Sequence, residues 1–164
     1  GSTLWLLSNG IDDRSVQTDH EAKSISNEVT FSQDVSDKSE MLTHLLRLTE
    51  QVGFRLRAAG LAGRTIHIKA RFPDFKTITR SATLASPSQK TQLLWQTVKY
   101  IAENKMNLER AYRLIGVGIQ QLSNAENIQH DLFADPKQNK LDSTADAIVH
   151  RYGKAALFRA GHRK

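Results

Sequence analysis

Polar and apolar side chains alternate along Thr65-Ile66-His67-Ile68-Lys69-Ala70-Arg71-Phe72, and Pro73-Asp74 follows directly. Strict alternation is typical of a half-buried β-strand, and Pro-Asp of a tight turn. Residues 75–84 read as the returning strand, so the sequence predicts a β-hairpin over 64–84. The first strand of this hairpin would turn its apolar side chains to a core and leave the other face to Thr65, His67, Lys69 and Arg71.

Two further strands are predicted outside the hairpin. Residues 23–31 alternate in the same way, and residues 112–122 carry one apolar face. Gly116 and Gly118 fall on the other face of this last strand, where the missing side chains would let another backbone come close.

Two helices complete the predicted fold. Residues 37–59 carry apolar side chains at helical spacing, with Asp37 and Glu40 as a capping box and Gly60 as the stop. The second helix would open at Pro87-Ser88. The order β-α-β-β-α-β most simply gives an α+β domain, in which a four-stranded antiparallel sheet carries two helices on one face.

The chain divides into three predicted regions. Residues 1–22 read as a tag remnant, the end of a preceding element and a linker, which suggests a piece excised from a longer protein. Residues 23–122 would form the folded domain. Residues 123–164 are polar and are expected to form a flexible C-terminal tail, with a linker over 135–140 and a weak helix over 141–158 that breaks near Gly153.

The positive charge is concentrated in the predicted domain. The chain has 23 Lys and Arg against 17 Asp and Glu, for a net charge of +6. Residues 23–122 alone hold 15 basic and 8 acidic side chains, for a net charge of +7. An excess of this kind within a folded region favours a structured surface for a polyanion.

Several classes of site find no support in the sequence. The chain contains no cysteine, which excludes disulfides, cysteine zinc sites and thiol chemistry. Its 6 histidines lack metal-ligand spacing, and no apolar run approaches the length of a membrane span. We therefore expect no catalytic residue, metal site, cofactor, small-molecule substrate or membrane partner in this chain.

Small hydroxyl side chains lie beside basic ones in the predicted strands 23–31 and 75–84. Hydroxyls and backbone N–H groups donate to phosphate oxygens, and the cations supply an attractive field. The phase of the second of these strands stays open, because Lys76 and Arg80 share parity with Ile78, so that a twist or bulge could redirect one end. The sequence predicts a DNA-backbone surface made of Ser24, Ser26, Lys69, Arg71, Lys76, Thr77, Thr79, Arg80, Ser81, Thr83 and Arg113.

Four stretches resemble the C-terminal little finger, or polymerase-associated, domain of Y-family DNA polymerases of the bacterial DinB type. They are Gly10-Ile11-Asp12-Asp13-Arg14-Ser15-Val16 at the end of the family's thumb, residues 23–31 in its first strand, Asp74-Phe75-Lys76-Thr77-Ile78-Thr79-Arg80-Ser81 in its central hairpin, and Arg113-Leu114-Ile115-Gly116-Val117 in its last strand. Their order and spacing over roughly residues 10–122 make the resemblance specific.

The resemblance implies a domain that sits in the major groove of duplex DNA and holds the backbone of the primer–template for an error-prone translesion polymerase. The palm domain, whose carboxylates hold Mg²⁺, would lie elsewhere in the parent enzyme, so no polymerase activity is expected of this fragment. Asp12 and Asp13 are adjacent acids in a linker and are not expected to bind metal. A bacterial cytoplasmic, nucleoid-associated protein is implied.

The stretch Gln129-His130-Asp131-Leu132-Phe133 is similar to the pentapeptide with which bacterial proteins bind the sliding clamp. By this resemblance Leu132 and Phe133 would anchor in an apolar pocket, and Gln129 and Asp131 would complete the contact. His130 stands where the pattern usually has Leu, which could weaken binding. In the alternative reading Leu132 and Phe133 pack back onto the domain.

Two other functions stay open from the sequence. The first is a protein-interaction module that acts only through residues 129–133, with the basic charge serving solubility. The second is a ferredoxin-like RNA-binding domain, although the hairpin lacks the paired aromatic side chains with which an RNA-recognition sheet stacks single-stranded bases.

Overall fold

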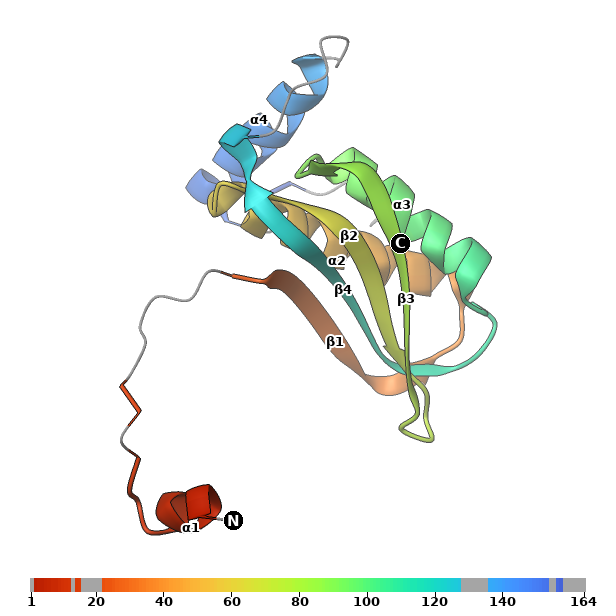
Figure 1. The fold of residues 1–164 in the computed structure, drawn as a ribbon. Helices are drawn as coiled ribbons and strands as arrows, with labels where there is room; N and C mark the ends of the chain where they lie inside the picture. Colours follow the sequence, from red (N-terminus) through yellow and green to blue (C-terminus); the bar gives the residue numbers. More distant parts are fainter. Residues whose placement is uncertain (1, 13, 16–21, 128–135, 154–155, 158–164) are drawn as a thin grey trace.

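The computed structural model describes residues 2–12, 14–15, 22–127, 136–153 and 156–157 (Figure 1). In chain order, its elements are α1 (Ser2–Ser8), β1 (Ser24–Val35), α2 (Lys38–Ala58), β2 (Leu61–Arg71), β3 (Thr77–Ser88), α3 (Thr91–Lys105), β4 (Tyr112–Asn124), the 3₁₀ turn η1 (Ala125–Asn127) and α4 (Pro136–Tyr152). From β1 to β4 the order is strand, helix, strand, strand, helix, strand, so the predicted α+β fold is confirmed.

The strands form one four-stranded antiparallel sheet in the order β1-β4-β2-β3. Strands β4 and β2 are therefore central, and β1 and β3 are the edges. In this register His67 of β2 lies opposite Ser81 of β3 and Gly118 of β4. Helices α2 and α3 lie against one face of the sheet, and none of the described helices covers the other face (Figure 1).

The hydrophobic core lies between the sheet and these two helices. Ile66 and Ile115 of the central strands pack with Leu45 of α2 and with Leu94 and Ile101 of α3, and all five side chains are buried. Burial of such apolar surface is the main favourable term in folding. It fixes which face of the sheet is free to meet a partner.

Helix α2 begins and ends as the sequence predicts. The Asp37 carboxylate accepts a hydrogen bond from the backbone N–H of Glu40 at 2.7 Å, as an N-cap should. Gly60 follows the helix with a φ of +64°, the left-handed conformation that glycine adopts without steric cost. Its N–H donates to the carbonyl of Arg57 at 3.0 Å, which closes the last turn.

Two of the boundaries that differ from the prediction lie at prolines. Strand β3 runs through Pro87 to Ser88, and α3 begins only at Thr91, so the expected helix start at Pro87-Ser88 is wrong. Proline is compatible with β3 because an edge strand has N–H groups that need no ladder partner. Helix α4 begins at Pro136, inside the stretch expected to be a linker, because proline at a first helical position costs no intrahelical hydrogen bond.

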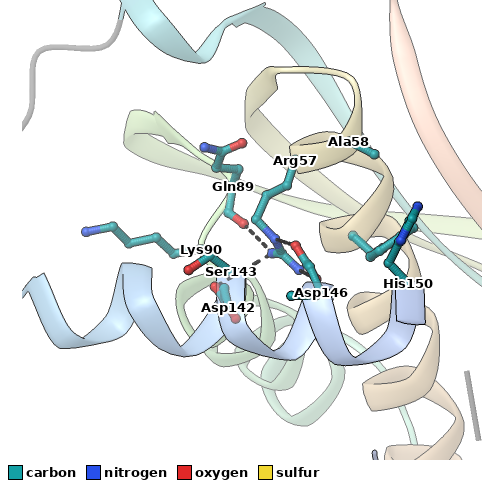
Figure 2. Close-up of a pocket in the computed structure, with 10 residues that line it drawn as sticks. Arg57, Ala58, Gln89, Lys90, Asp142, Ser143, Asp146 and His150 are labelled. Atoms are coloured by element: carbon teal, nitrogen blue, oxygen red, sulfur yellow. Dashed lines mark hydrogen bonds and ion pairs between the residues drawn. The ribbon is translucent and has the colours of Figure 1, made fainter. Parts of the chain in front are cut away.

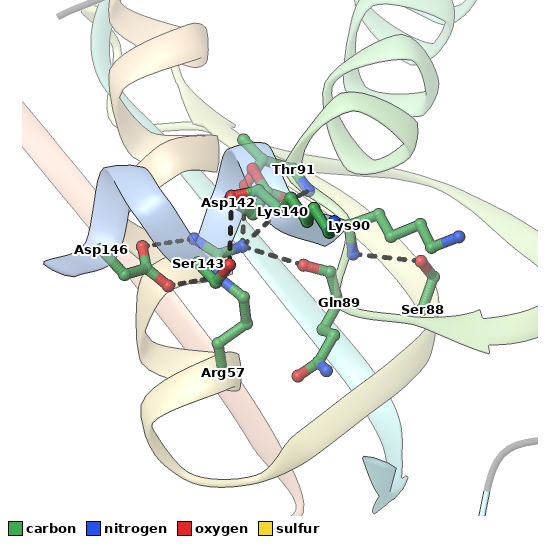
Figure 3. Close-up of polar contacts among 9 residues, drawn as sticks. All are labelled: Arg57, Ser88, Gln89, Lys90, Thr91, Lys140, Asp142, Ser143 and Asp146. Atoms are coloured by element: carbon green, nitrogen blue, oxygen red, sulfur yellow. Dashed lines mark hydrogen bonds and ion pairs between the residues drawn. The ribbon is translucent and has the colours of Figure 1, made fainter. Parts of the chain in front are cut away.

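Helix α4 is anchored to the ends of α2 and α3 through Arg57 (Figure 3). The Arg57 guanidinium donates to both carboxylate oxygens of Asp146, at 2.6 and 2.8 Å, and to the carbonyl of Gln89 at 3.0 Å. One turn before Asp146 on the helix, Asp142 accepts the backbone N–H of Thr91 at 2.9 Å. Because α3 has no side-chain cap from its own N-cap residue, α4 supplies one across the fold.

A shallow pocket of about 480 Å³ lies along this seam (Figure 2). Phe54 and Ala58 of α2 line one side, and Ala147 and His150 of α4 line the other. The carboxylates in it already bond to Arg57 and to the start of α3, so the pocket is the seam of a docked helix and not a preformed ligand site.

Candidate nucleic-acid interface

The face of the sheet opposite the helices gathers hydroxyl side chains from β1, β2 and β3. Along β3 every second residue points to this face, with Thr77 opposite Arg71 and Thr79 opposite Lys69 in the register. This set, called here the hydroxyl face, consists of Ser24, Ser26, Thr30, Thr65, Thr77, Thr79, Ser81 and Thr83, with Lys69 and Arg71 among them. Eight of the eleven residues predicted to bind DNA are therefore on one surface.

Gly116 and Gly118 leave space on the hydroxyl face for side chains of the flanking strands. A Cβ atom added to Gly118 would lie 2.4 Å from the His67 imidazole, and one added to Gly116 would lie 2.8 Å from the Cβ of Glu28. We expected another backbone to approach these glycines. At Gly116 the backbone of β1 does come close, because an added Cβ would lie 3.2 Å from the Asn27 carbonyl oxygen. At Gly118 the space is filled by the side chains of His67 and Ser26.

Lys69 pairs with Glu28 across the central strand β4. Gly116 lies between the two residues in the register, so the Lys69 ammonium reaches the Glu28 carboxylate at 2.9 Å. Glu28 was absent from the predicted site, although it has the same parity along β1 as Ser24 and Ser26 and could have been found from that alternation. A polyanion on this face must compete with Glu28 for Lys69.

Several of the hydroxyls are oriented by hydrogen bonds between strands. The hydroxyls of Thr65 and Thr83 lie 3.1 Å apart, and Thr65 also donates to the side-chain oxygen of Gln121 at 2.8 Å. Arg71 donates from Nε to the Thr77 hydroxyl at 3.0 Å, which spreads its guanidinium along the sheet. These bonds order the surface before any ligand arrives.

His67 lies in the middle of the hydroxyl face, over Gly118. Its Nδ1 is buried and has no hydrogen-bond partner among the described residues. Partial burial lowers the pKa of His67 from the ordinary value for histidine, so the imidazole is neutral at pH 7. The centre of the face thus offers polar atoms without adding charge.

The other three predicted basic residues do not lie among the hydroxyls. Arg80 is on the helix side of β3 and donates from Nε to the carbonyl of Lys105 at 3.1 Å, at the end of α3, which settles the phase that the sequence left open. The reason is the regular alternation of β3, which sends Thr79 and Arg80 to opposite faces. Lys76 belongs to the hairpin turn, and Arg113 stands over the ring of Phe75 at the hairpin tip.

The predicted clamp-binding residues Gln129, Asp131, Leu132 and Phe133 lie outside the described residues. The described chain stops before them at the end of η1, Asn127, and resumes with α4 at Pro136. Within the described ranges, no three His, Asp or Glu side chains gather as metal ligands. No described helix combines the length and the apolar character needed to cross a membrane.

Residues 22–132 match the model of the impB/mucB/samB family C-terminal domain. Among curated proteins, the chain is 36% identical over 159 residues to the DNA polymerase IV of Caulobacter vibrioides and 34% identical over 160 residues to that of Brucella melitensis. Both matches cover 96% of this chain but only 39% and 36% of the two relatives. The chain therefore spans less than half the length of these polymerases.

A solved structure shares the fold. It is a complex of the beta-clamp processivity factor and the little finger domain of PolIV, which matches with a TM-score of 0.50 and 22% identity. The match covers 68% of this chain and 99% of the matched one.

Proposed function

The chain belongs to the impB/mucB/samB family C-terminal domain, and we propose that it is the DNA-binding little finger of an error-prone, translesion DNA polymerase of the Y-family. Family membership confirms the resemblance to the DinB-type little finger that the sequence shows. In this proposal residues 23–122 grip the primer–template duplex through its phosphates, without sequence specificity. The parent protein is a DNA polymerase IV of the bacterial cytoplasm and nucleoid.

The hydroxyl face carries this proposal. It presents two rows of exposed hydroxyls, on β1 and β3, on either side of Lys69, Arg71 and the neutral His67. Hydroxyls donate to phosphate oxygens on any sequence, and the two cations attract the backbone over a longer range. With few groups shaped to read base edges in a fixed pattern, such a surface positions a duplex and leaves sequence selection to the polymerase active site.

Glu28 sets an upper limit on how tightly this face binds. In the free protein it neutralises Lys69 at 2.9 Å, and a phosphate that takes its place leaves the carboxylate facing the DNA. Binding that is firm but not tight suits a domain that must slide with the growing duplex.

The second proposed contact is with the bacterial sliding clamp, through Gln129, Asp131, Leu132 and Phe133. The support is the pentapeptide pattern and its place directly after the strand β4 and η1. The solved relative of the same fold is itself in complex with a beta-clamp. Helix α4, anchored by Arg57, follows this peptide and would hold its downstream end to the domain.

Nucleotidyl transfer and its Mg²⁺ ions are assigned to the part of the polymerase that this chain does not span. The fragment itself would be non-catalytic, with no cofactor and no small-molecule substrate. Its contribution is to position the substrate, because a duplex held in a fixed orientation beside the catalytic domain reacts faster than one that meets the domain by diffusion.

The test is fluorescence anisotropy of the chain with a labelled primer–template duplex from low to physiological salt. If about five phosphates are neutralised, log affinity should fall against log salt with a slope of about −4 to −5, the same for any sequence. Failure to bind at low salt would reject the proposal and leave the clamp peptide as the main function. Preference for single-stranded RNA over this duplex would favour an RNA-binding domain instead.

A further inference from the structure

Phe75 adopts a backbone conformation that phenylalanine rarely takes. It sits at the tip of the β2–β3 hairpin with a φ of +65°, in the left-handed region. The Cβ atom makes this region unfavourable for most residues, whereas glycine and asparagine enter it readily. A residue kept in such a conformation against an easier alternative points to a use for its side chain.

The ring of Phe75 is not buried. Phe75 is 63% exposed and does not belong to the hydrophobic core. A single exposed phenylalanine is ordinary on a protein surface and would carry no inference alone. Here the exposure coincides with the strained backbone.

Hydrogen bonds fix the turn that carries Phe75. The Phe75 N–H donates to the carbonyl of Phe72 at 3.0 Å, and the Phe72 N–H donates to the carbonyl of Lys76 at 3.0 Å. The Asp74 carboxylate accepts the Lys76 N–H at 3.0 Å, so the one acidic group of the turn is occupied within the backbone. An aromatic ring on a fixed turn loses little conformational entropy when it binds.

One cation, Arg113, covers the ring. The guanidinium carbon of Arg113 lies 5.0 Å from the ring centroid and covers one face, as in a cation–π pair. Arg71 and Thr77, hydrogen-bonded to each other, are the last pair of the hydroxyl face before the turn. The hairpin projects beyond the ends of the other strands, so the turn that carries Phe75 lies just past the last pair of the hydroxyl face (Figure 1).

We propose that Phe75, backed by Arg113, stacks on an unpaired base of DNA at the single-strand end of a primer–template junction. This inference rests on the proposed binding of duplex DNA by the hydroxyl face. Base faces inside a paired duplex are covered by the neighbouring pairs, and a blunt end exposes only the outer face of its last pair. An unpaired template base is free to turn a face to the ring, so the contact favours a junction over a blunt end. Arg113 closes the rear of the ring and brings charge toward the adjoining phosphate.

The test compares two labelled duplexes of equal paired length, one blunt and one with a single-stranded template overhang, by anisotropy with the full chain. The variant Phe75→Asn removes the ring and suits the left-handed backbone, and Phe75→Tyr keeps the ring as the matched control. Base stacking of this kind predicts at least about a fivefold preference of the wild type for the overhang duplex. Phe75→Asn should lose that preference and Phe75→Tyr should keep it. The salt slope should be unchanged in both, because a stacked ring displaces no counterions.

Thermal unfolding of the same variants separates binding from folding. Phe75→Asn should have an unchanged or higher Tm, because the strained backbone is relieved. A fall in Tm of more than about 5 °C would show that the ring is a packing element and would overturn the inference. An overhang preference retained by Phe75→Asn, or equal binding of both duplexes by the wild type, would also overturn it while leaving the proposed function intact. Wild-type protein that binds neither duplex would reject the proposed function itself.

Discussion

Replacing Arg57 should destabilise the domain more than any other single charge removal on its surface. The side chain makes four hydrogen bonds, two to Asp146, one to the Gln89 carbonyl and one to the Thr91 hydroxyl at 2.8 Å. Its removal breaks the ion pairs with Asp146 at 2.6 Å and with Asp142 at 3.6 Å. The variant Arg57→Met is the sharper choice, because it keeps the apolar stem and deletes the charge.

The expected loss of stability in Arg57→Met follows from the burial of its ion pairs. Breaking a buried ion pair by deleting one partner costs about 3–5 kcal/mol. The side chains of Arg57, Asp142 and Asp146 are 16%, 8% and 24% exposed, so water relieves part of that cost. We therefore expect a loss of about 2–3 kcal/mol, which lowers the urea midpoint by about 1 M or more at the m-values usual for small domains.

Urea unfolding and amide hydrogen exchange would measure this effect together. The expected result is a lower midpoint and a loss of protection in α4 and in the first turn of α3. Asp146→Asn, combined with Arg57→Met in a double-mutant cycle, should show a coupling of at least about 1 kcal/mol. An unchanged midpoint with unchanged protection of α4 would refute the reasoning, because it would mean that the Arg57 network does not hold this helix.

Three further predictions concern the hydroxyl face. Glu28→Gln should raise affinity for duplex DNA by about threefold to tenfold at low salt and steepen the salt slope by up to about one, since Lys69 loses its competing carboxylate. The matched control Glu103→Gln removes a carboxylate on the helix side and should leave the anisotropy titrations unchanged. Lys69→Ala and Arg71→Ala should each flatten the salt slope by about one on every DNA sequence, whereas Arg80→Ala should leave it unchanged. Equal effects of the three variants would contradict the assignment of Arg80 to the other face. The lowered pKa of His67 means that the unfolded chain, with an ordinary histidine pKa of about 6.5, binds more protons than the folded one between the two pKa values. The stability that neutral His67 contributes is therefore complete above about pH 6.5 and is lost as the pH falls through the pKa of His67 in the folded protein. Urea midpoints at pH 7.5 and 5.5 should differ more for the wild type than for His67→Gln. Identical differences would show that His67 does not titrate as described.

Local patterns were enough to predict the sheet. The alternation from Thr65 to Phe72 fixed both the strand and its faces, and Asp37 and Gly60 marked the two ends of α2. The phase of β3 was open because a basic residue and apolar ones share parity there, and only the register with β2 shows that Arg80 follows the apolar set.

Features that depend on contacts between distant residues were not predictable in this way. Arg57 and Asp146 are separated by 89 positions in the sequence, and neither alternation nor helical spacing brings them together. The docking of α4 depends on that contact, which is why the polar residues at the start of this helix read as a linker. Nothing in the sequence marks Phe75 as left-handed, because the tight turn after Pro73 could have placed any residue there.

The central claim is that DNA lies on the hydroxyl face. Chemical-shift mapping of the isotope-labelled chain during titration with a primer–template duplex tests it most directly. The account predicts that shifts concentrate in β1, β2 and β3, around Ser26, Lys69 and Thr79, and that α2 and α3 stay unchanged. Shifts concentrated on α2 and α3, with the sheet unaffected, would contradict it.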